Sequence, residues 1–537
     1  MYFAHLKFIL FKMKRITLLA FLLSVFIVNA QDPNILWDLT IGGGEDDRLF
    51  SINKTTDGGY ILGGISESGI SGDKTENKIG FLDYWVVKLD ENGFIQWQNT
   101  IGGNYLDTLR KVFQTTDGGY IIGGYSSSAI SGDKSENVIG SEDYWVVKLN
   151  SSGTIEWENT IGGNGEDLLY DIKQTDDNGY ILAGTSDSDI SFDKTESSKG
   201  GKDYWLVKLN SLGIKEWDKT IGGNSGDILY SISFTSDNGL ILGGHSASDI
   251  SGDKTENNIG LSDYWVLKLD SSYNIEWQNT IGGNDTDTME SVIEDNDGGF
   301  ILAGNSLSNI SGDKTENSNG IYDLWVVKLD NLGNIIWQNT LGGNASDFLR
   351  ALTLSNDGGC IVTGSSQSNI SGDKNENTLG WADYWVLKIN SNGILTGQNT
   401  IGGFGADASF SILQDTDGGF VIGGASDSSI SGDKTQNSQG SFDYWVVKID
   451  GTLGITETLL SKGITLYPNP AKNTLQLNTQ DKTINQINIY TMSGSKVLQL
   501  EVDTISPTVD VSGLASGVYF VQLYSGKNVA LKKFIKE

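Results

Sequence analysis

The chain has 537 residues, of which 68 are acidic and 37 basic, so its net charge at pH 7 is -31. Such a negative field repels nucleic acid and anionic membranes, and the sequence therefore argues against a nucleic-acid partner. Hydrophobic residues make up 38% and aromatic residues 10% of the chain, which is enough to form a core and excludes a disordered protein. With 69 glycines and only 4 prolines, the composition is typical of short strands joined by tight turns.

The N-terminal residues have the three parts of a secretory signal. Met13-Lys14-Arg15 is a short basic start, an apolar stretch follows at 16–28, and Val28-x-Ala30 is a small-residue cleavage site. The apolar stretch covers 13 residues, whereas a membrane-spanning helix needs about 20. We therefore predict a leader and signal peptide at 1–30, with Met13 as an alternative start, and a mature chain that begins at Gln31 without a transmembrane segment.

From residue 35 to residue 450 the sequence repeats with a period of 60 residues. The clearest marker is the triplet Asp-Tyr/Leu-Trp, which recurs at Asp83, Asp143, Asp203, Asp263, Asp323, Asp383 and Asp443. A repeat of this length is one supersecondary unit that cannot bury its apolar surface alone. The repeat therefore predicts one closed or stacked array and not seven independent domains.

Each unit contains four strand signals. In the unit at 167–221 they lie at 167–175, 180–186, 203–209 and 214–221, and turns rich in Asp, Asn and Gly separate the first from the second and the third from the fourth. No stretch shows a sustained helical period of apolar residues. The array is therefore predicted to be all-β, and four antiparallel strands repeated around one point form a propeller blade.

The phase of the repeat predicts how the ring closes. Ile35–Ile41 has the sequence of a fourth strand with no first three strands before it, and the last unit, Asp407–Asp450, supplies three strands without a fourth. We therefore predict that the N-terminal strand completes the last blade, which gives a seven-bladed β-propeller over residues 31–450. Closure would also remove the exposed sheet edges at the two ends of the array.

Thirteen of the 14 tryptophans occupy two repeated positions, and Trp381 alone lies elsewhere. The segment Asp90–Trp97 has the pattern Asp-x-x-Gly-x-x-x-Trp and resembles the tryptophan-docking motif of quinoprotein-type propellers, which implies packing between blades and no cofactor site. The pattern fails at Asn390–Gly397, where Gly replaces Trp and a weaker contact is expected. The whole unit is similar to the long tandem propeller repeats of secreted Bacteroidetes proteins, which implies a propeller but no defined activity.

After a linker at 451–463 the composition changes, and 464–537 is predicted to be a second domain. Its motifs are Tyr467-Pro468-Asn469-Pro470, a strand and turn that end at Gly494, Gly517-Val518-Tyr519, and Lys532-Lys533-Phe534. In this order they strongly resemble the type A C-terminal sorting domain of type IX secretion substrates. The resemblance implies a small β-sandwich that engages the secretion machinery and takes the protein to the cell surface or outside. The two prolines are expected to lead into the first strand and Gly517 to mark a turn.

The long loop between the second and third strands carries Ile-Ser-Gly-Asp-Lys-Thr/Ser-Glu-Asn in most units. These loops share one face with the links between blades, and we predict that this face binds the ligand. Its candidate residues are Asp73, Glu76, Asn77, Asp133, Glu136, Asn137, Asp253, Glu256, Asn257, Asp313, Glu316, Asn317, Asp373, Glu376, Asn377 and Trp381.

Hard oxygen ligands at this spacing suit Ca²⁺. However, Lys74 and its equivalents stand inside the cluster, and the pattern of a dedicated calcium loop is missing. We therefore predict that these residues form turns and surface ion pairs, with no bound metal or cofactor, and keep calcium as the alternative.

No catalytic group stands out. Acidic residues recur in register, whereas catalysis needs one asymmetric constellation, and the repeats contain only Arg48, Arg110 and Arg350 as arginines. His245, at the end of a second strand, is interpreted as a side chain near a loop, and Cys360 as a buried strand residue in the place of Tyr60. The irregular aromatic residues at the loops are suited to stacking on sugar rings; they are Phe81, Tyr105, Trp381 and Phe404.

We therefore expect an exported, non-catalytic binding or scaffold propeller at the cell surface or in the extracellular space, with a glycan or a protein as its ligand. A polysaccharide-active hydrolase or lyase is the alternative. A structural component of a surface layer is the second alternative.

Overall fold

The computed structural model describes residues 35–451, 464–479, 482–491, 496–525 and 528–537. The predicted signal peptide and nearly all of the predicted linker lie outside these ranges. Every regular element in the described ranges is a β-strand. Among those residues there is also no helix with the length and hydropathy needed to cross a membrane.

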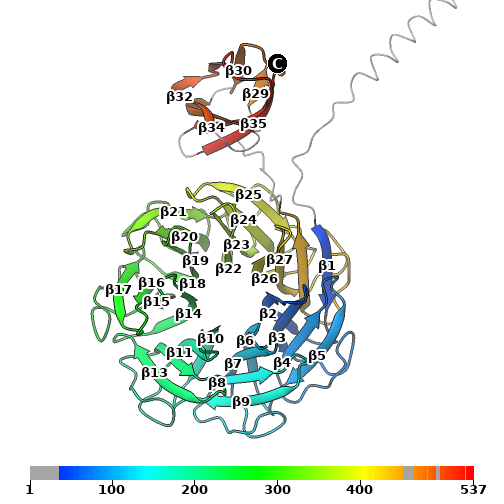
Figure 1. Ribbon diagram of the computed structural model, residues 1–537, viewed down its shortest axis with the longest axis vertical. Coiled ribbons are helices and arrows are strands. Elements are labelled where there is room, and N and C mark those ends of the chain that lie inside the picture. The colour runs from blue at the N-terminus through cyan, green and yellow to red at the C-terminus, as the bar shows by residue number, and fades with distance from the viewer. Residues whose placement is uncertain (1–34, 452–463, 480–481, 492–495, 526–527) are drawn as a thin grey trace, which may run out of the picture.

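Residues 35–450 form seven four-stranded antiparallel sheets, and Figure 1 shows them arranged as the blades of a β-propeller around a common centre. In each blade the first strand of the unit lies innermost and the fourth lies outermost. The sequence predicted the strands of the unit at 167–221 to within one residue, since they span Asp167–Gln174, Tyr180–Ser186, Asp203–Leu209 and Lys215–Ile221.

The first strands are β2 (Asp47–Lys54), β6 (Asp107–Gln114), β10 (Asp167–Gln174), β14 (Asp227–Phe234), β18 (Asp287–Glu294), β22 (Asp347–Leu354) and β26 (Asp407–Gln414). The second strands are β3 (Tyr60–Ser66), β7 (Tyr120–Ser126), β11 (Tyr180–Ser186), β15 (Leu240–Ser246), β19 (Phe300–Ser306), β23 (Cys360–Ser366) and β27 (Phe420–Ser426). The third strands are β4 (Asp83–Leu89), β8 (Asp143–Leu149), β12 (Asp203–Leu209), β16 (Asp263–Leu269), β20 (Asp323–Leu329), β24 (Asp383–Ile389) and β28 (Asp443–Ile449). The fourth strands are β1 (Ile35–Ile41), β5 (Ile95–Ile101), β9 (Ile155–Ile161), β13 (Lys215–Ile221), β17 (Ile275–Ile281), β21 (Ile335–Leu341) and β25 (Leu395–Ile401).

The N-terminal strand completes the blade at the end of the array. β1 pairs antiparallel with β28, with Thr40 opposite Trp445, and the strand order of this sheet is β1-β28-β27-β26. Gln436 also accepts a hydrogen bond of 2.9 Å from the Thr40 amide. The predicted pairing of the two ends of the repeat is therefore confirmed.

Neighbouring blades contact each other through the aromatic residues of their third strands. The Tyr84 ring lies 4.8 Å from the Trp145 ring in the next blade, and its hydroxyl donates a 3.1 Å hydrogen bond to the Trp145 carbonyl. The same pair closes the ring, where Tyr444 lies 4.8 Å from Trp85 and donates to its carbonyl at 2.9 Å. The seven third-strand tryptophans are buried, so each blade fills part of its neighbour's core.

The tryptophans of the fourth strands contact the turn between the third and fourth strands of the next blade. Trp97 lies against Gly153, and the Asn99 amide donates to the Gly153 carbonyl at 2.7 Å. This confirms the packing implied by the docking motif. The predicted weak contact at Gly397 falls partly outside the described residues, because the equivalent of Gly153 there is residue 453.

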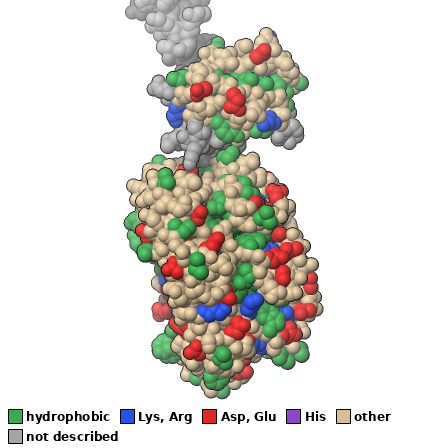
Figure 2. All heavy atoms as spheres, turned by 90° about the vertical axis from the view of Figure 1, so that its left-hand side faces the viewer, with side chains coloured by type: hydrophobic (Ala, Val, Ile, Leu, Met, Phe, Trp, Pro, Cys, Tyr) green, Lys and Arg blue, Asp and Glu red, His purple; other side chains and the backbone are tan. Residues whose placement is uncertain are grey.

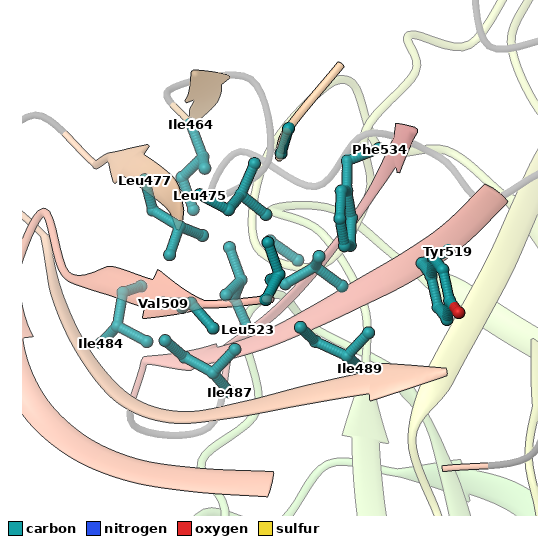
Figure 3. Packing of buried hydrophobic residues seen from close by; sticks show 14 residues of the cluster. Ile464, Leu475, Leu477, Ile484, Ile487, Ile489, Val509, Tyr519, Leu523 and Phe534 are labelled. Carbon is teal, nitrogen blue, oxygen red and sulfur yellow. The ribbon is translucent and has the colours of Figure 1, made fainter. Parts of the chain in front are cut away.

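The C-terminal residues form a three-stranded and a four-stranded sheet around one apolar core. Figure 3 shows Ile464, Leu475, Val509 and Phe534 among the side chains that meet there. The first sheet contains β29 (Thr465–Tyr467), β30 (Thr474–Asn478) and β33 (Thr508–Asp510). The second contains β32 (Lys496–Ile505), β31 (Thr483–Thr491), β34 (Gly517–Ser525) and β35 (Asn528–Lys536).

Two local predictions for this domain were wrong. Pro468 and Pro470 follow the first strand instead of leading into it, because the three residues before them pair with β30. Gly517 is the first residue of β34 and pairs with Lys536, so the turn ends just before it.

A matched pair of glycines tests the tryptophan contact. Gly153 and Gly118 both have positive φ angles, 85° and 83°. A Cβ added at Gly153 would lie 2.9 Å from the Trp97 ring, whereas a Cβ added at Gly118 would have no neighbouring atom within 4 Å. Gly118→Ala should lower the free energy of unfolding by about 1–2 kcal/mol through backbone strain alone. Gly153→Ala should cost about 1–3 kcal/mol more, because it also overpacks the contact. Urea unfolding followed by tryptophan fluorescence measures both, and equal losses would contradict the contact.

The closing contact can be tested in the same way. Tyr444→Phe removes the hydroxyl that bonds to Trp85, and Tyr84→Phe removes the equivalent group between two sequential blades. Each should lower the free energy of unfolding by about 0.5–1.5 kcal/mol. A loss for Tyr84→Phe with none for Tyr444→Phe would mean that the two ends of the array do not meet in solution.

Candidate functional site

The predicted loop carboxylates make hydrogen bonds within the fold. Glu76 accepts a 2.6 Å hydrogen bond from the Thr100 amide, and Asp73 accepts one of 3.3 Å from the Gly42 amide in the link that enters its blade. Glu136, Glu256, Glu316 and Glu376 have the same role as Glu76. Asp133, Asp253, Asp313 and Asp373 have the same role as Asp73. These carboxylates therefore hold the loops to the ring.

The loop asparagines act within their own loops. Asn77 accepts a hydrogen bond from the Ile70 amide at 3.3 Å, and Asn137, Asn257, Asn317 and Asn377 do the same in their units. Asp73, Glu76 and Asn77 thus hold three different backbone segments and do not converge on one point. In the described part of the chain, no three His, Cys, Asp or Glu side chains are placed together so that they could hold a metal ion.

The loop face also exposes apolar side chains. Trp381 is 73% and Phe404 77% exposed, and their segments meet where the Trp381 amide donates to the Gly405 carbonyl at 2.8 Å. Phe81 and Tyr105 form a second exposed pair with rings 5.5 Å apart. An isoleucine at the start of each long loop is exposed as well; these are Ile70, Ile130, Ile190, Ile250, Ile310, Ile370 and Ile430. On the outer side of the ring, Figure 2 shows many acidic and few basic side chains.

A second group of side chains that break the repeat lies on the first strands, at the centre of the ring. Each first strand contains a β-bulge, and the bulged residue has no partner in the second strand. The seven bulged residues, here called the axial belt, are Phe50, Arg110, Tyr170, Tyr230, Glu290, Arg350 and Phe410. Because a bulge changes the direction of its side chain, these residues reach their equivalents in neighbouring blades.

One half of the axial belt is an aromatic run around a cation. Phe410 and Phe50 lie 5.0 Å apart, and Tyr170 and Tyr230 lie 4.7 Å apart. Between these pairs, the Arg110 guanidinium lies 5.1 Å from the Phe50 ring and 5.4 Å from the Tyr170 ring. Distances of this size are typical of cation–π contacts, so Arg110 joins the two aromatic pairs.

The other half of the belt contains an ion pair. Arg350 lies 3.1 Å from Glu290, and the Asn305 side chain lies 3.3 Å from the same carboxylate oxygen. Burial raises the pKa of Glu290, and the Arg350 charge opposes that shift.

His245 is the next-to-last residue of β15, near the long loop as predicted, and its half-buried ring lies 5.6 Å from the Tyr230 ring of the axial belt. Burial lowers its pKa to about 4, so the imidazole is neutral at physiological pH. Cys360 is buried in β23 as predicted.

In the C-terminal domain, the structure brings the first and last sorting motifs together. Asn469 accepts a 2.9 Å hydrogen bond from the Ile535 amide, next to the Lys532-Lys533-Phe534 motif. Tyr519 stacks on Phe534 with centroids 5.6 Å apart. Tyr467 is exposed, and Gly494 lies outside the described residues.

Comparison with known proteins identifies the C-terminal domain. Residues 465–537 match the family model described as "Secretion system C-terminal sorting domain". The domain is a type IX sorting domain, so the protein is secreted by the type IX system to the cell surface or the extracellular space. Among curated proteins, none matches the chain.

Solved propellers resemble the fold distantly. The Pan2 WD40 domain of Neurospora crassa is 12% identical with a TM-score of 0.41 over 80% of this chain and 99% of that one. Hydrazine synthase of Kuenenia stuttgartiensis is 11% identical with a TM-score of 0.41 over 74% and 95% of the two chains. Drosophila Plexin A is 8% identical with a TM-score of 0.41 over 78% and 88%. Such likeness carries no argument about the site, and the propeller assignment rests on the sheet order.

A buried charge cluster recurs beside the loop face. Asp47 and Asp83, the first residues of β2 and β4, are buried together with Lys74. Lys74 interacts electrostatically with both carboxylates and with Glu76. Burial therefore raises the pKa of both aspartates, and in the next blade it raises the pKa of Asp143 to about 6.

The sign of the resulting pH dependence follows from these shifts. A carboxyl with a raised folded pKa stabilises the fold below its unfolded pKa, and this contribution is lost as pH rises through about 6. The Thr175 hydroxyl and the Gly179 amide hold the pKa of Asp177 at about 2, so its contribution to stability is lost as pH falls from about 4 to about 2.

The melting temperature should therefore rise from pH 7.5 to pH 5 and fall below pH 4. Asp143→Asn should reduce the first change without abolishing it, because burial also raises the pKa of Asp227 and Asp263 to about 6. A melting temperature that falls steadily from pH 7.5 to pH 5 would contradict this prediction.

Proposed function

We propose that the protein is an exported, non-catalytic binding or scaffold module that recognises an extracellular glycan or protein. In this proposal a signal peptide (1–30) precedes a complete seven-bladed propeller (31–450). A linker (451–463) then leads to a β-sandwich that is the sorting domain (464–537). The sorting residues are Tyr467, Pro468, Asn469, Pro470, Gly494, Gly517, Tyr519, Lys532 and Lys533.

The observation that carries the proposal is the division between repeated and unrepeated side chains. The repeated loop carboxylates accept hydrogen bonds from the scaffold. The varied polar and aromatic residues of the first strands contact one another in the axial belt, where one ligand can meet an asymmetric surface. The axial belt contains one carboxylate, Glu290, whereas glycoside hydrolysis generally uses two in one cleft. The belt therefore supports binding more than hydrolysis.

The loop face supports the glycan as ligand. Exposed aromatic faces stack on the C–H surfaces of sugar rings, and Trp381 and Phe404 expose two such faces on segments joined by a backbone hydrogen bond. In this proposal the loop carboxylates and asparagines form the polar part of the binding face, around the exposed aromatic residues.

A glycan array with the full mature protein, followed by chromatography of the bound glycans, tests the proposal. We expect retention of a subset of glycans without product. Turnover would favour the hydrolase or lyase, and absence of binding to any glycan or surface protein would favour a structural surface-layer component.

The contribution of the loop aromatics can be measured separately. Trp381→Ala should weaken binding of an array-selected glycan about 2–10-fold, which corresponds to the loss of one aromatic stack. Leu261 occupies the equivalent position in another unit and is also exposed, so Leu261→Ala is a matched control that should leave affinity unchanged. Equal affinities for the two variants in calorimetric titrations would remove Trp381 from the binding face.

A further inference from the structure

The three arginines in the repeats, Arg48, Arg110 and Arg350, all lie on first strands, at the centre of a strongly acidic protein. Two of them have a carboxylate partner. Arg48 forms two hydrogen bonds of 2.7 Å with Asp46, and Arg350 lies 3.1 Å from Glu290. These two guanidinium groups are therefore largely neutralised by the protein itself.

Arg110 differs from both. Its Nη2 donates a 3.0 Å hydrogen bond to the neutral Tyr125 hydroxyl, and its Nε is buried without a hydrogen-bond partner. Within the described ranges no carboxylate lies at ion-pair distance from it, and Glu142 and Glu290 interact with its charge only from farther away. The surrounding ring faces offset part of the free-energy cost of burying the Arg110 charge. Among the residues that the structure describes, the guanidinium group nevertheless has no anion bound to it.

We infer that the axial belt is a binding site for a carboxylate-bearing saccharide, with Arg110 as the residue that recognises the carboxylate. This inference rests on the proposed binding function and names its ligand class. A guanidinium presents planar, paired donors that match a carboxylate better than a hydroxyl. The Arg110 guanidinium lies beside the rings of Tyr170 and Phe50, so an acidic group that binds there brings the rest of its ligand against aromatic faces.

The surroundings favour a uronic-acid saccharide over an acidic peptide. A pyranose ring offers flat C–H surfaces for the Tyr170–Tyr230 pair, whose rings lie 4.7 Å apart. Its hydroxyls can bind the polar belt residues Glu290 and Arg350. The net charge of -31 also repels long polyanions. The site is therefore suited to a short oligosaccharide, whose carboxylate meets the one cation of the belt that lacks a carboxylate partner.

Calorimetric titration of the full mature protein with tri-galacturonate and with neutral tri-galactose tests the ligand class. We expect the uronate to bind at least about 10-fold more tightly, as a charge-assisted hydrogen-bonded contact provides. Equal affinities for the acidic and neutral saccharides, or no binding of the acid, would overturn the inference and leave the proposed binding function in place. A tri-aspartate peptide that binds as tightly as the uronate would overturn the saccharide class.

Variants of the arginines test the recognising residue. Arg110→Met should weaken uronate binding about 10-fold or more and leave the affinity for the neutral saccharide unchanged. Arg48→Met is the matched control, because Arg48 is already paired with Asp46, and it should change uronate affinity less than about 3-fold. Unchanged uronate affinity in Arg110→Met would overturn the assignment.

If Arg110→Met does not fold, Arg110→Lys is the second variant, because it keeps the charge without the paired donors. It should still weaken uronate binding, and wild-type affinity in this variant would equally overturn the assignment.

Discussion

The fold depends on the contact in which a third-strand tyrosine of one blade covers the third-strand tryptophan of the next. Tyr84 and Trp145 show it between sequential blades, and Tyr444 and Trp85 show it across the closure. Each blade leaves part of its largest buried side chain for its neighbour to cover, so no blade is complete alone. At one boundary the tyrosine is Leu324, which packs in the same cluster without a hydroxyl. The arrangement of the axial belt therefore depends on closure, since its side chains come from all seven first strands.

Much of this architecture could be predicted from the sequence, because the period brings every strand and turn into register. The unpaired fourth strand Ile35–Ile41 predicted the closing contact, which β1 and β28 form. The role of the loop carboxylates was harder to see, because the amide that Glu76 binds lies 24 residues away on another strand. Gln436, which replaces Glu and still accepts from Thr40, was a signal that the position needs an acceptor oxygen and not a charge.

The axial belt was missed for a physical reason. Sequence reasoning gave weight to positions that recur, and a position that holds Phe, Arg, Tyr and Glu in different units resembles an unconstrained surface site. The bulge that directs these side chains inward has no sequence signature of its own here. An alignment of the seven units shows that this strand position changes between aromatic, basic and acidic residues, and that change is the signal that could have found it. His245 was correctly placed at the end of its strand, but its contact with Tyr230 was missed because that contact depends on the bulge.

The bulge has one more consequence. A bulged residue lies outside the pairing register of its strand, so its side chain can be exchanged without loss of a cross-strand partner. Each unit therefore contributes one position where the side chain can vary without a change in strand pairing. A gene library randomised at these seven codons would keep a constant framework, and selection from it could yield receptors for unrelated small molecules.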